Sequence, residues 1–519
     1  MSAAVEVPSV DPRFRAEMAR LAGAAGALWL GRCESDRQLR VAIPMREAVG
    51  AGHALVLGST GAGKTRVVAG IAAQMLSRIV ENPASQGIVV VDHKGDLVAL
   101  VRSLLGDLVE RLPSQDAERL LSALVVVNPF SSTALLPLQI LRPEPAVPAE
   151  LLAYEVTTLL DRVGGADLGV RQDSFLYHLV LLGVGTGRSL PELADLLSDP
   201  TALVAAGASS PHADVRAYFA GAIRLASASL EGVRARLHRL LRLPAARLML
   251  GARRSVSFRK LLASRIVLVD LGSPPFGCED LARFWSGLVT LKLTRAIFER
   301  TPAEAARPVA VFVDEWQEGL AAGGDIAEHY ERVLAMARSR GVSLWLISQS
   351  LATAARVSSS LPRIVATNTH LQFLFKSSQE DARTMAAILP VTGRRARAGV
   401  PPWEERSRTP YLTSREELDV LISEATQLPE RVFHLWNRNR PYRAQLLRAD
   451  TVEVRARMGR SRELAARLED GALSVPLGEL EADLVRRSQS GFRPIVASAA
   501  GATGAAATGR VPRRPRRER

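Results

Sequence analysis

The sequence has little cysteine, few aromatic residues and no long apolar run. Two cysteines, Cys33 and Cys278, occur among 519 residues, and their separation matches no metal-ligand spacing. This excludes a disulfide-rich secreted domain and favours a reducing cytosol. Aromatic residues make up 5% of the chain, and no window reaches the roughly 18 apolar residues that a membrane-spanning helix needs. We therefore expect no integral membrane segment.

The charge of the chain is strongly basic. Lysine and arginine number 67 against 53 aspartates and glutamates, a formal net charge of +14, while 47% apolar residues is an ordinary globular proportion. A basic excess favours a polyanionic partner, nucleic acid first and anionic lipid second. The alternative is a solvated basic surface in an arginine-rich protein.

Short apolar runs alternate with helical patterns, which indicates parallel strands covered on both faces. Between 145 and 255 the strand patterns stop and helical periodicity takes over, and strands return afterwards. We therefore predict one α/β domain interrupted by an all-α inserted domain. The predicted strands are 53–57, 88–91, 124–127, 266–270, 309–313, 343–348 and 371–376.

The chain is longer than one typical domain, so we expect several parts. The last part is rich in Ala, Gly, Thr and then Arg, a composition that cannot bury a core, and we predict a basic disordered tail. The expected division is a lead segment (1–50), the α/β domain's first part (51–144), the all-α insertion (145–255), the α/β domain's second part (256–450), a helical C-terminal extension (451–496) and the tail (497–519).

A glycine-rich loop between a predicted strand and a predicted helix fits G-x-x-x-x-G-K-[ST]. The glycines let backbone N–H groups wrap phosphates at the positive end of the following helix. Lys64 would reach the β- and γ-phosphates of ATP, and Thr65 would ligate Mg²⁺. The predicted cofactor-binding residues are Gly58, Ser59, Thr60, Gly61, Ala62, Gly63, Lys64 and Thr65.

Two adjacent carboxylates end the apolar run 309–313. A hydrolysing P-loop enzyme needs one carboxylate near Mg²⁺ and a second that activates water. Asp314 would hold the metal's water shell, and Glu315 would polarise the attacking water. The alternative is an acidic turn at a strand end.

A polar residue and two arginines complete the predicted catalytic set. Gln349 ends an apolar strand, where a polar side chain can sense the γ-phosphate. Arg338 or Arg340 would act as an arginine finger on a neighbouring subunit. A plain surface role for either arginine stays open. For Asp92, Lys94 and Asp96, which follow strand 88–91, a structural ion pair and a catalytic role are both open.

Clustered arginines are the expected contacts to a nucleic acid backbone. Since aromatic residues are not interleaved with them, base stacking looks minor, and phosphate binding without sequence readout is the implied mode. A solvated basic face is the alternative for each cluster. The clusters comprise Arg234, Arg236, Arg239 and Arg242, then Arg394, Arg395 and Arg397, then the terminal arginines.

The order of these motifs resembles the type IV coupling proteins. These TraG/TraD-like ATPases of conjugative DNA transfer belong to the FtsK/HerA superfamily of P-loop ATPases. The likeness spans roughly residues 28–450. It rests on the P-loop segment 53–65, on 91–96, on the helical insertion, on Asp314-Glu315, and on 337–341 leading to Gln349-Ser350.

The resemblance implies a RecA-like motor domain of the ASCE class bearing an all-α domain and assembled as a homo-hexameric ring around DNA. Under it, Lys64, Glu315 and Gln349 are catalytic, Thr65 and Asp314 hold Mg²⁺, and Arg338 matches the family's finger better than Arg340. A relaxase or a membrane channel would be the partner in type IV secretion. The location would be the cytoplasm, or the periphery of the inner membrane through that partner.

The chain departs from the family in two ways that leave alternatives open. Many coupling proteins begin with transmembrane helices, which this sequence lacks, and the 50 residues before the P-loop leave little room for the β-barrel of HerA-type helicases. A HerA/FtsK-like motor in repair or phage defence and a protein-secretion ATPase on the same fold are the alternatives. A nucleotide-switched DNA-binding scaffold is a third, which Glu315 disfavours.

Overall fold

The structure is a computed structural model in which much of the chain between residues 10 and 489 is described. Among the described residues, no helix is long and apolar enough to cross a lipid bilayer. The ranges not described are 1–9, 25, 51, 144–146, 162, 164–167, 222–226, 273, 275–277, 321–323, 387–412, 441–443, 451–460 and 490–519.

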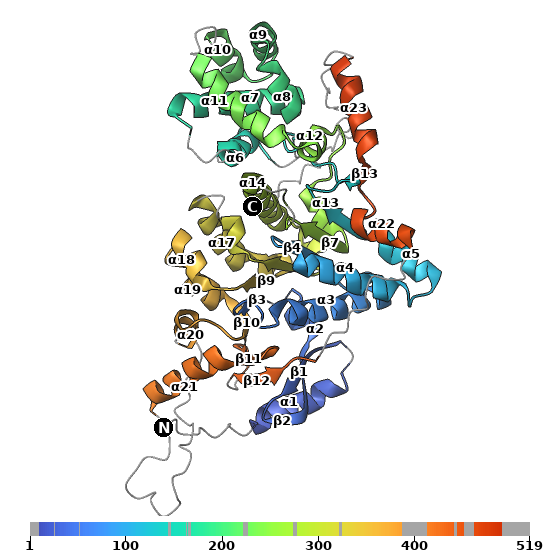
Figure 1. Cartoon of the computed structure of the whole chain (residues 1–519), viewed down its shortest axis with the longest axis vertical. Helices are drawn as coiled ribbons and strands as arrows, with labels where there is room; N and C mark the ends of the chain where they lie inside the picture. Colours follow the sequence, from blue (N-terminus) through green and yellow to red (C-terminus); the bar gives the residue numbers. More distant parts are fainter. Residues whose placement is uncertain are drawn as a thin grey trace, which may run out of the picture.

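An eleven-stranded sheet organises the α/β part of the chain, in the order β2-β1-β12-β11-β10-β3-β9-β8-β4-β7-β5 (Figure 1). From β10 to β5 all neighbouring strands are parallel. Each predicted strand is confirmed to within two residues at either end, and the α/β fold class is confirmed with them. The parallel strands are β3 (His53–Leu57), β4 (Gly87–Asp92), β5 (Leu124–Val127), β7 (Ile266–Asp270), β8 (Val309–Asp314), β9 (Val342–Ser348) and β10 (Thr369–Leu374).

Four antiparallel strands extend this sheet beyond β10. They are β1 (Ala27–Cys33), β2 (Asp36–Pro44), β11 (Val432–Asn437) and β12 (Gln445–Arg448). Strand β1 pairs with β12, so the first described strand lies beside the last strand of this sheet in the chain. Sequence patterns did not predict β2, β11 or β12, because polar residues interrupt the apolar alternation and long-range pairing sets their register.

Alternate residues of the central strands feed two separate cores. Val89 and Val91 of β4 belong to one core, whereas Ile88 and Val90 belong to the other. Helices α3 (Lys64–Glu81) and α4 (Asp96–Val109) cover the second face together with α1 (Pro12–Ala22) and α5 (Ser114–Ser122). Helices α14 (Glu279–Phe298), α17 (Gly324–Met336) and α19 (Leu361–Asn368) cover the first. The strands are thus buried on both faces, as their unbroken apolar runs indicate.

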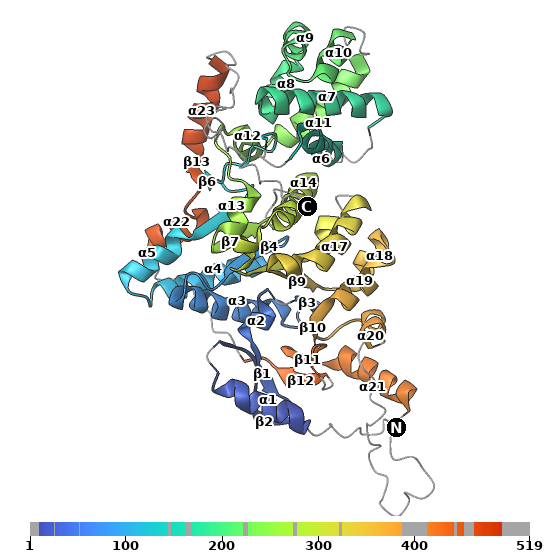
Figure 2. The same cartoon turned by 180° about the vertical axis from the view of Figure 1, so that it is seen from behind.

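The described residues from 149 to 251 form helices, which gather at one end of the molecule in both views (Figures 1 and 2). A buried ion pair between Arg295 of α14 and Glu155 of α6 joins these helices to the α/β part. The helices are α6 (Ala149–Asp161), α7 (Val170–Thr186), α8 (Leu190–Leu196), α9 (Pro200–Ala208), α10 (Ala213–Gly221), α11 (Ser227–Leu241) and α12 (Pro244–Gly251).

The C-terminal extension, described over 461–489, runs from the α/β part to the all-α part. Helix α22 (Arg462–Asp470) packs on α4 and β5, and α23 (Leu477–Gln489) packs on α12 (Figures 1 and 2). Arg487 of α23 forms a 2.6 Å ion pair with Glu192 of α8. Both side chains are largely buried, so this pair fastens the extension to the insertion.

The remaining short elements connect these layers. They are α2 (Met45–Ala48), β6 (Ala134–Leu135), α13 (Phe258–Ala263), α15 (Pro302–Ala305), α16 (Gln317–Leu320), the 3₁₀ helix η2 (Ala337–Arg340), α18 (Leu351–Val357), α20 (Gln379–Ala386), α21 (Ser414–Gln427) and β13 (Val475–Pro476).

Candidate nucleotide-binding site

The P-loop connects β3 to α3 at the carboxyl edge of the sheet. Gly61 and Gly63 have φ angles of 77° and 91°, a left-handed conformation that glycine adopts without steric cost. Gly63 is the N-cap of α3 and Lys64 its first residue, so the unpaired N–H groups of the first helical turn point into the loop. This arrangement suits a phosphate.

The Lys64 side chain folds over its own loop. It is 7% exposed, and its Nζ donates hydrogen bonds to the carbonyl oxygens of Gly58 and Ser59, the second at 3.0 Å. Burial lowers the pKa of Lys64, and the nearby Glu315 and Asp314 charges oppose this effect. A cation held only by carbonyl oxygens at the mouth of the loop is placed to exchange them for phosphate oxygens.

Three carboxylates stand side by side at this edge of the sheet. In the strand register Asp92 of β4 pairs with Asp314 of β8 on one side and with Asp270 of β7 on the other. The Asp92 carboxylate accepts backbone N–H groups of Lys94 at 2.8 Å and Val98 at 2.9 Å. Asp92 therefore shapes the turn into α4, which favours the structural alternative for this residue.

Asp314 lies where the sequence prediction needs a metal ligand. Its pKa is raised to about 7 by burial first, then by the negative charges of Asp92 and Glu315. A divalent cation would relieve this repulsion. The Asp314 carboxylate and the Thr65 hydroxyl are hard oxygen donors of the kind Mg²⁺ prefers, and such sites take their remaining ligands from water and phosphate.

Glu315 is held tightly in a strained backbone conformation. Its φ is 49°, rare for a residue with a side chain, and it is 4% exposed. Its Oε1 lies 2.5 Å from Lys94 Nζ, and its Oε2 accepts Gln317 Nε2 at 2.5 Å. Burial raises the pKa of Glu315, but the Lys94 and Gln317 hydrogen bonds outweigh it, so the net pKa lies below its usual value. Glu315 is therefore ionised.

Gln349 connects the P-loop to Glu315. It directly follows β9, which lies between β3 and β8 in the sheet. Its Oε1 accepts the Thr60 hydroxyl at 2.9 Å, and its backbone N lies 3.4 Å from Glu315 Oε2. A residue whose side chain contacts the phosphate loop and whose backbone N contacts the predicted base is suitably placed for a sensor.

The two candidate finger arginines lie far from this edge. They belong to η2, which precedes β9, whereas Gln349 follows it, so they lie at the amino edge of the parallel sheet. Arg340 is partly buried and donates to the carbonyl oxygen of Arg300 at 2.9 Å. The Arg338 side chain is exposed. Of the two, Arg338 is the one available to another subunit.

Arg431 is a residue of the P-loop surroundings that sequence patterns did not reveal. It has a φ of 64°, its backbone N donates to the carbonyl oxygen of Ala62 at 2.9 Å, and a Cβ on Gly63 would lie 2.7 Å from its Cγ. It precedes β11, itself unpredicted. The contact arises from long-range packing, which leaves no local pattern.

The predicted nucleic acid arginines do not all face solvent. Arg236 forms a 3.5 Å ion pair with Asp161 and its side chain is 11% exposed, so its prediction as a backbone contact was wrong. The charge stabilises the contact between α11 and α6 instead. Arg239 and Arg242 are exposed. The clusters at 394–397 and in the tail lie outside the described residues.

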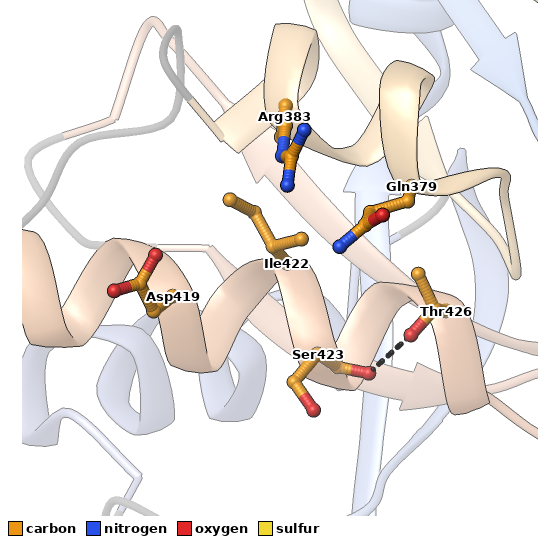
Figure 3. A pocket seen from close by; sticks show the side chains of 6 residues that line it. All are labelled: Gln379, Arg383, Asp419, Ile422, Ser423 and Thr426. Carbon is orange, nitrogen blue, oxygen red and sulfur yellow. Dashed lines mark hydrogen bonds between the residues drawn. The ribbon is translucent and has the colours of Figure 1, made fainter.

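A hollow of about 490 Å³ lies between α20 and α21 (Figure 3). None of the P-loop or predicted catalytic residues lines it. Figure 3 shows Gln379 and Arg383 of α20 facing Ile422 of α21, and Thr426 donating to the carbonyl oxygen of Ser423 at 2.8 Å. Nothing in this hollow indicates a specific ligand.

His53 joins the base of the P-loop strand to α17 and β9, the two elements on either side of η2 in the chain. Its Nδ1 accepts the Leu344 N–H of β9 at 3.0 Å, and its Nε2 donates to the carbonyl oxygen of Leu334 of α17 at 3.0 Å. These two roles require the neutral ring. Burial, the largest cause, lowers the pKa of His53 from 6.5 to about 4.

Acid is therefore expected to destabilise the protein through His53. The unfolded chain takes up a proton below about pH 6.5 and the folded chain only below about 4, so stability falls through this window by up to about 3 kcal/mol. In thermal unfolding from pH 7 to 4.5, His53→Gln should lose less of its unfolding temperature than the wild type. His238→Gln, on an exposed position of α11, is the control. An unchanged pH dependence in His53→Gln would contradict this assignment.

The P-loop, the two strand-end carboxylates and the strand order together define a P-loop ATPase site on a RecA-like fold. Residues 28–157 match the family model described as the central domain of helicase HerA. No curated protein matches the chain.

Two solved structures are similar to this chain over most of its length. VirB4 of Thermoanaerobacter pseudethanolicus is 12% identical, with 83% of this chain and 98% of that chain covered and a TM-score of 0.52. The bacterial conjugative coupling protein TrwBdeltaN70 is 15% identical over 85% of this chain and 93% of that chain, with a TM-score of 0.48. The likeness to VirB4 shows the fold. The HerA family model supports the FtsK/HerA part of the resemblance over residues 28–157.

Proposed function

We propose that this protein is an ATP-driven DNA translocase of the type IV coupling protein kind, which pumps or recruits DNA for conjugative transfer. The observation that carries the proposal is the ionised, buried Glu315 joined through Gln349 to a P-loop. A second carboxylate of this kind serves hydrolysis more than binding. The match to the central domain of a helicase supports DNA as the substrate.

Each residue of the site has a role in this proposal. Backbone N–H groups of the P-loop and Lys64 bind the β- and γ-phosphates. Thr65 and Asp314 hold Mg²⁺, which would neutralise charge on the phosphates. Glu315 accepts a proton from the attacking water as it approaches the γ-phosphate, and Gln349 reports whether that phosphate is present.

The position of Arg338 supports a ring. An exposed arginine at the amino edge of the sheet cannot reach the P-loop at the carboxyl edge of its own subunit, so its cation would serve the site of a neighbour. A closed ring with such head-to-tail contacts gives every site a finger. We propose a homo-hexamer around DNA, as the resemblance implies.

The proposed function also implies how DNA is bound, which protein is the partner and where the protein works. DNA would be held through phosphate contacts without sequence readout, as the net charge of +14 favours. A relaxase or a membrane-channel protein would be the partner, and the protein would work in the cytoplasm or at the inner membrane through that partner. A HerA/FtsK-like role in repair or phage defence would use the same motor.

DNA should accelerate ATP hydrolysis by the full chain. The steady-state rate would be measured with no DNA, with single-stranded DNA and with double-stranded DNA across a salt series. We expect stimulation that weakens steeply as salt rises, because released counterions drive phosphate contacts. Lys64→Ala, which lacks the phosphate-binding cation, should show no turnover under any condition. Hydrolysis that neither DNA accelerates would overturn the proposal.

A protein-secretion ATPase is the second candidate function. The observation that favours it is the exposure of large apolar side chains on the all-α part, with Leu151 46%, Tyr154 57% and Val170 87% exposed. Such positions suit contact with a protein. Turnover that DNA leaves unchanged and that a secreted or channel protein accelerates would establish this candidate over the first.

A further inference from the structure

In this structure Lys94 forms an ion pair with Glu315, the predicted general base. Its Nζ lies 2.5 Å from Glu315 Oε1, while Gln317 holds Oε2. A general base must offer an oxygen lone pair to the water it activates. The Lys94 cation on one oxygen and the Gln317 amide on the other each take up one lone pair, which holds the carboxylate in place and weakens it as a base toward water.

The backbone of Lys94 is fixed by its neighbours. Asp92 accepts the Lys94 N–H, and Gly95 follows with a φ of 88°. The segment after β7 presses on this turn so closely that a Cβ on Gly272 would lie 1.9 Å from the carbonyl carbon of Lys94. The Lys94 backbone therefore cannot shift unless the segment after β7 moves with it.

That segment leads to the all-α part. It lies between β7, which follows the insertion in the chain, and α14, whose Arg295 forms the buried ion pair with Glu155 of α6. Helix α14 also packs on α6. Helix α14 packs on α16 as well, and Gln317 of α16 holds the other carboxylate oxygen of Glu315, so described helices connect the insertion to the partners of Glu315. The Lys94 side chain is 44% exposed, so it has room to leave Glu315.

We propose that Lys94 is a latch on Glu315, a positioning residue that keeps this carboxylate away from the attacking water until substrate engagement releases it. The proposal rests on the proposed function and adds that DNA bound at the exposed Arg239 and Arg242 of the insertion is the releasing substrate. In this proposal a subunit without DNA hydrolyses ATP slowly, and DNA accelerates hydrolysis because its binding breaks the ion pair between Lys94 and Glu315.

Lys94→Met should raise the rate without DNA and leave the DNA-stimulated rate close to that of the wild type. The basal kcat is expected to rise roughly tenfold, the scale of one lost hydrogen bond between charged groups, with the KM for ATP unchanged. The ratio of stimulated to basal rate falls by the same factor. Lys94→Arg, which keeps the cation, should restore low basal turnover. Lys260→Met, at an exposed lysine of α13, is the matched control.

Two outcomes would overturn the latch. A loss of both basal and stimulated turnover in Lys94→Met would make Lys94 part of the catalytic machinery, and an unchanged basal kcat would make the ion pair structural only. The failure of the proposed function is distinguishable, because it would appear as a wild type that DNA does not stimulate. The latch is read independently from the basal rate.

Discussion

Glu315→Gln is expected to lower kcat for ATP hydrolysis by roughly 10²- to 10⁴-fold, the usual contribution of a general base. Glutamine has nearly the same shape but accepts no proton from water. Since Lys64 and the P-loop backbone are untouched, ATP should bind with nearly unchanged affinity. The variant should accumulate as an ATP-bound assembly.

The measurement is phosphate release at saturating ATP, paired with equilibrium binding of ATP. Glu318→Gln is the matched control, because Glu318 is an exposed carboxylate on α16, three residues further along the chain. It should retain wild-type turnover. If Glu315→Gln hydrolyses ATP at the wild-type rate, Glu315 is not the general base. The assignment of the catalytic site to the carboxyl edge of the sheet would then be wrong.

Arg338→Ala is expected to lower kcat by roughly 10³- to 10⁵-fold, the range for an arginine that neutralises charge on a transferring phosphoryl group. The affinity for ATP should change little, because the cation acts mainly in the transition state. Arg340→Ala should have a far smaller effect, since Arg340 donates to the carbonyl oxygen of Arg300 in its own subunit. Comparable losses in both variants would contradict the choice of Arg338.

Mixing subunits tests whether Arg338 acts on a neighbour. Neither Lys64→Ala nor Arg338→Ala alone should turn over ATP. Mixed in one assembly, an Arg338→Ala subunit supplies an intact P-loop and a Lys64→Ala subunit supplies an intact finger, so some interfaces become complete. Partial recovery of turnover is the expected result. No recovery in mixtures shown to co-assemble would contradict a shared site.

Local patterns predicted the parts of the molecule that local chemistry determines. The strands 53–57 and 266–270 contain the unbroken apolar runs 54–57 and 266–269, and burial on both faces is the one interpretation that fits them. The P-loop was recognisable because Gly63 adopts backbone angles that few other residues tolerate, and a Cβ on Gly58 would lie 2.5 Å from that of Phe375. Its position between a strand and a helix followed from the same runs.

The contacts that long-range packing creates were not predictable. Lys94 and Glu315 are 221 residues apart, and only the strand order places β4 beside β8. Both a structural and a catalytic role for Lys94 were open from the sequence, and the register decides that it meets Glu315. The sequence likewise gave no sign that Arg236 turns inward to Asp161, because a helical arginine looks the same whether it is paired or solvated.

The most direct test of a DNA motor is ATP-dependent displacement of streptavidin from the end of biotinylated DNA, in single-stranded and double-stranded form. We predict that the full chain displaces streptavidin from at least one of these DNAs when ATP and Mg²⁺ are present, and that Glu315→Gln does not. ATP hydrolysis without displacement from either DNA would contradict the account.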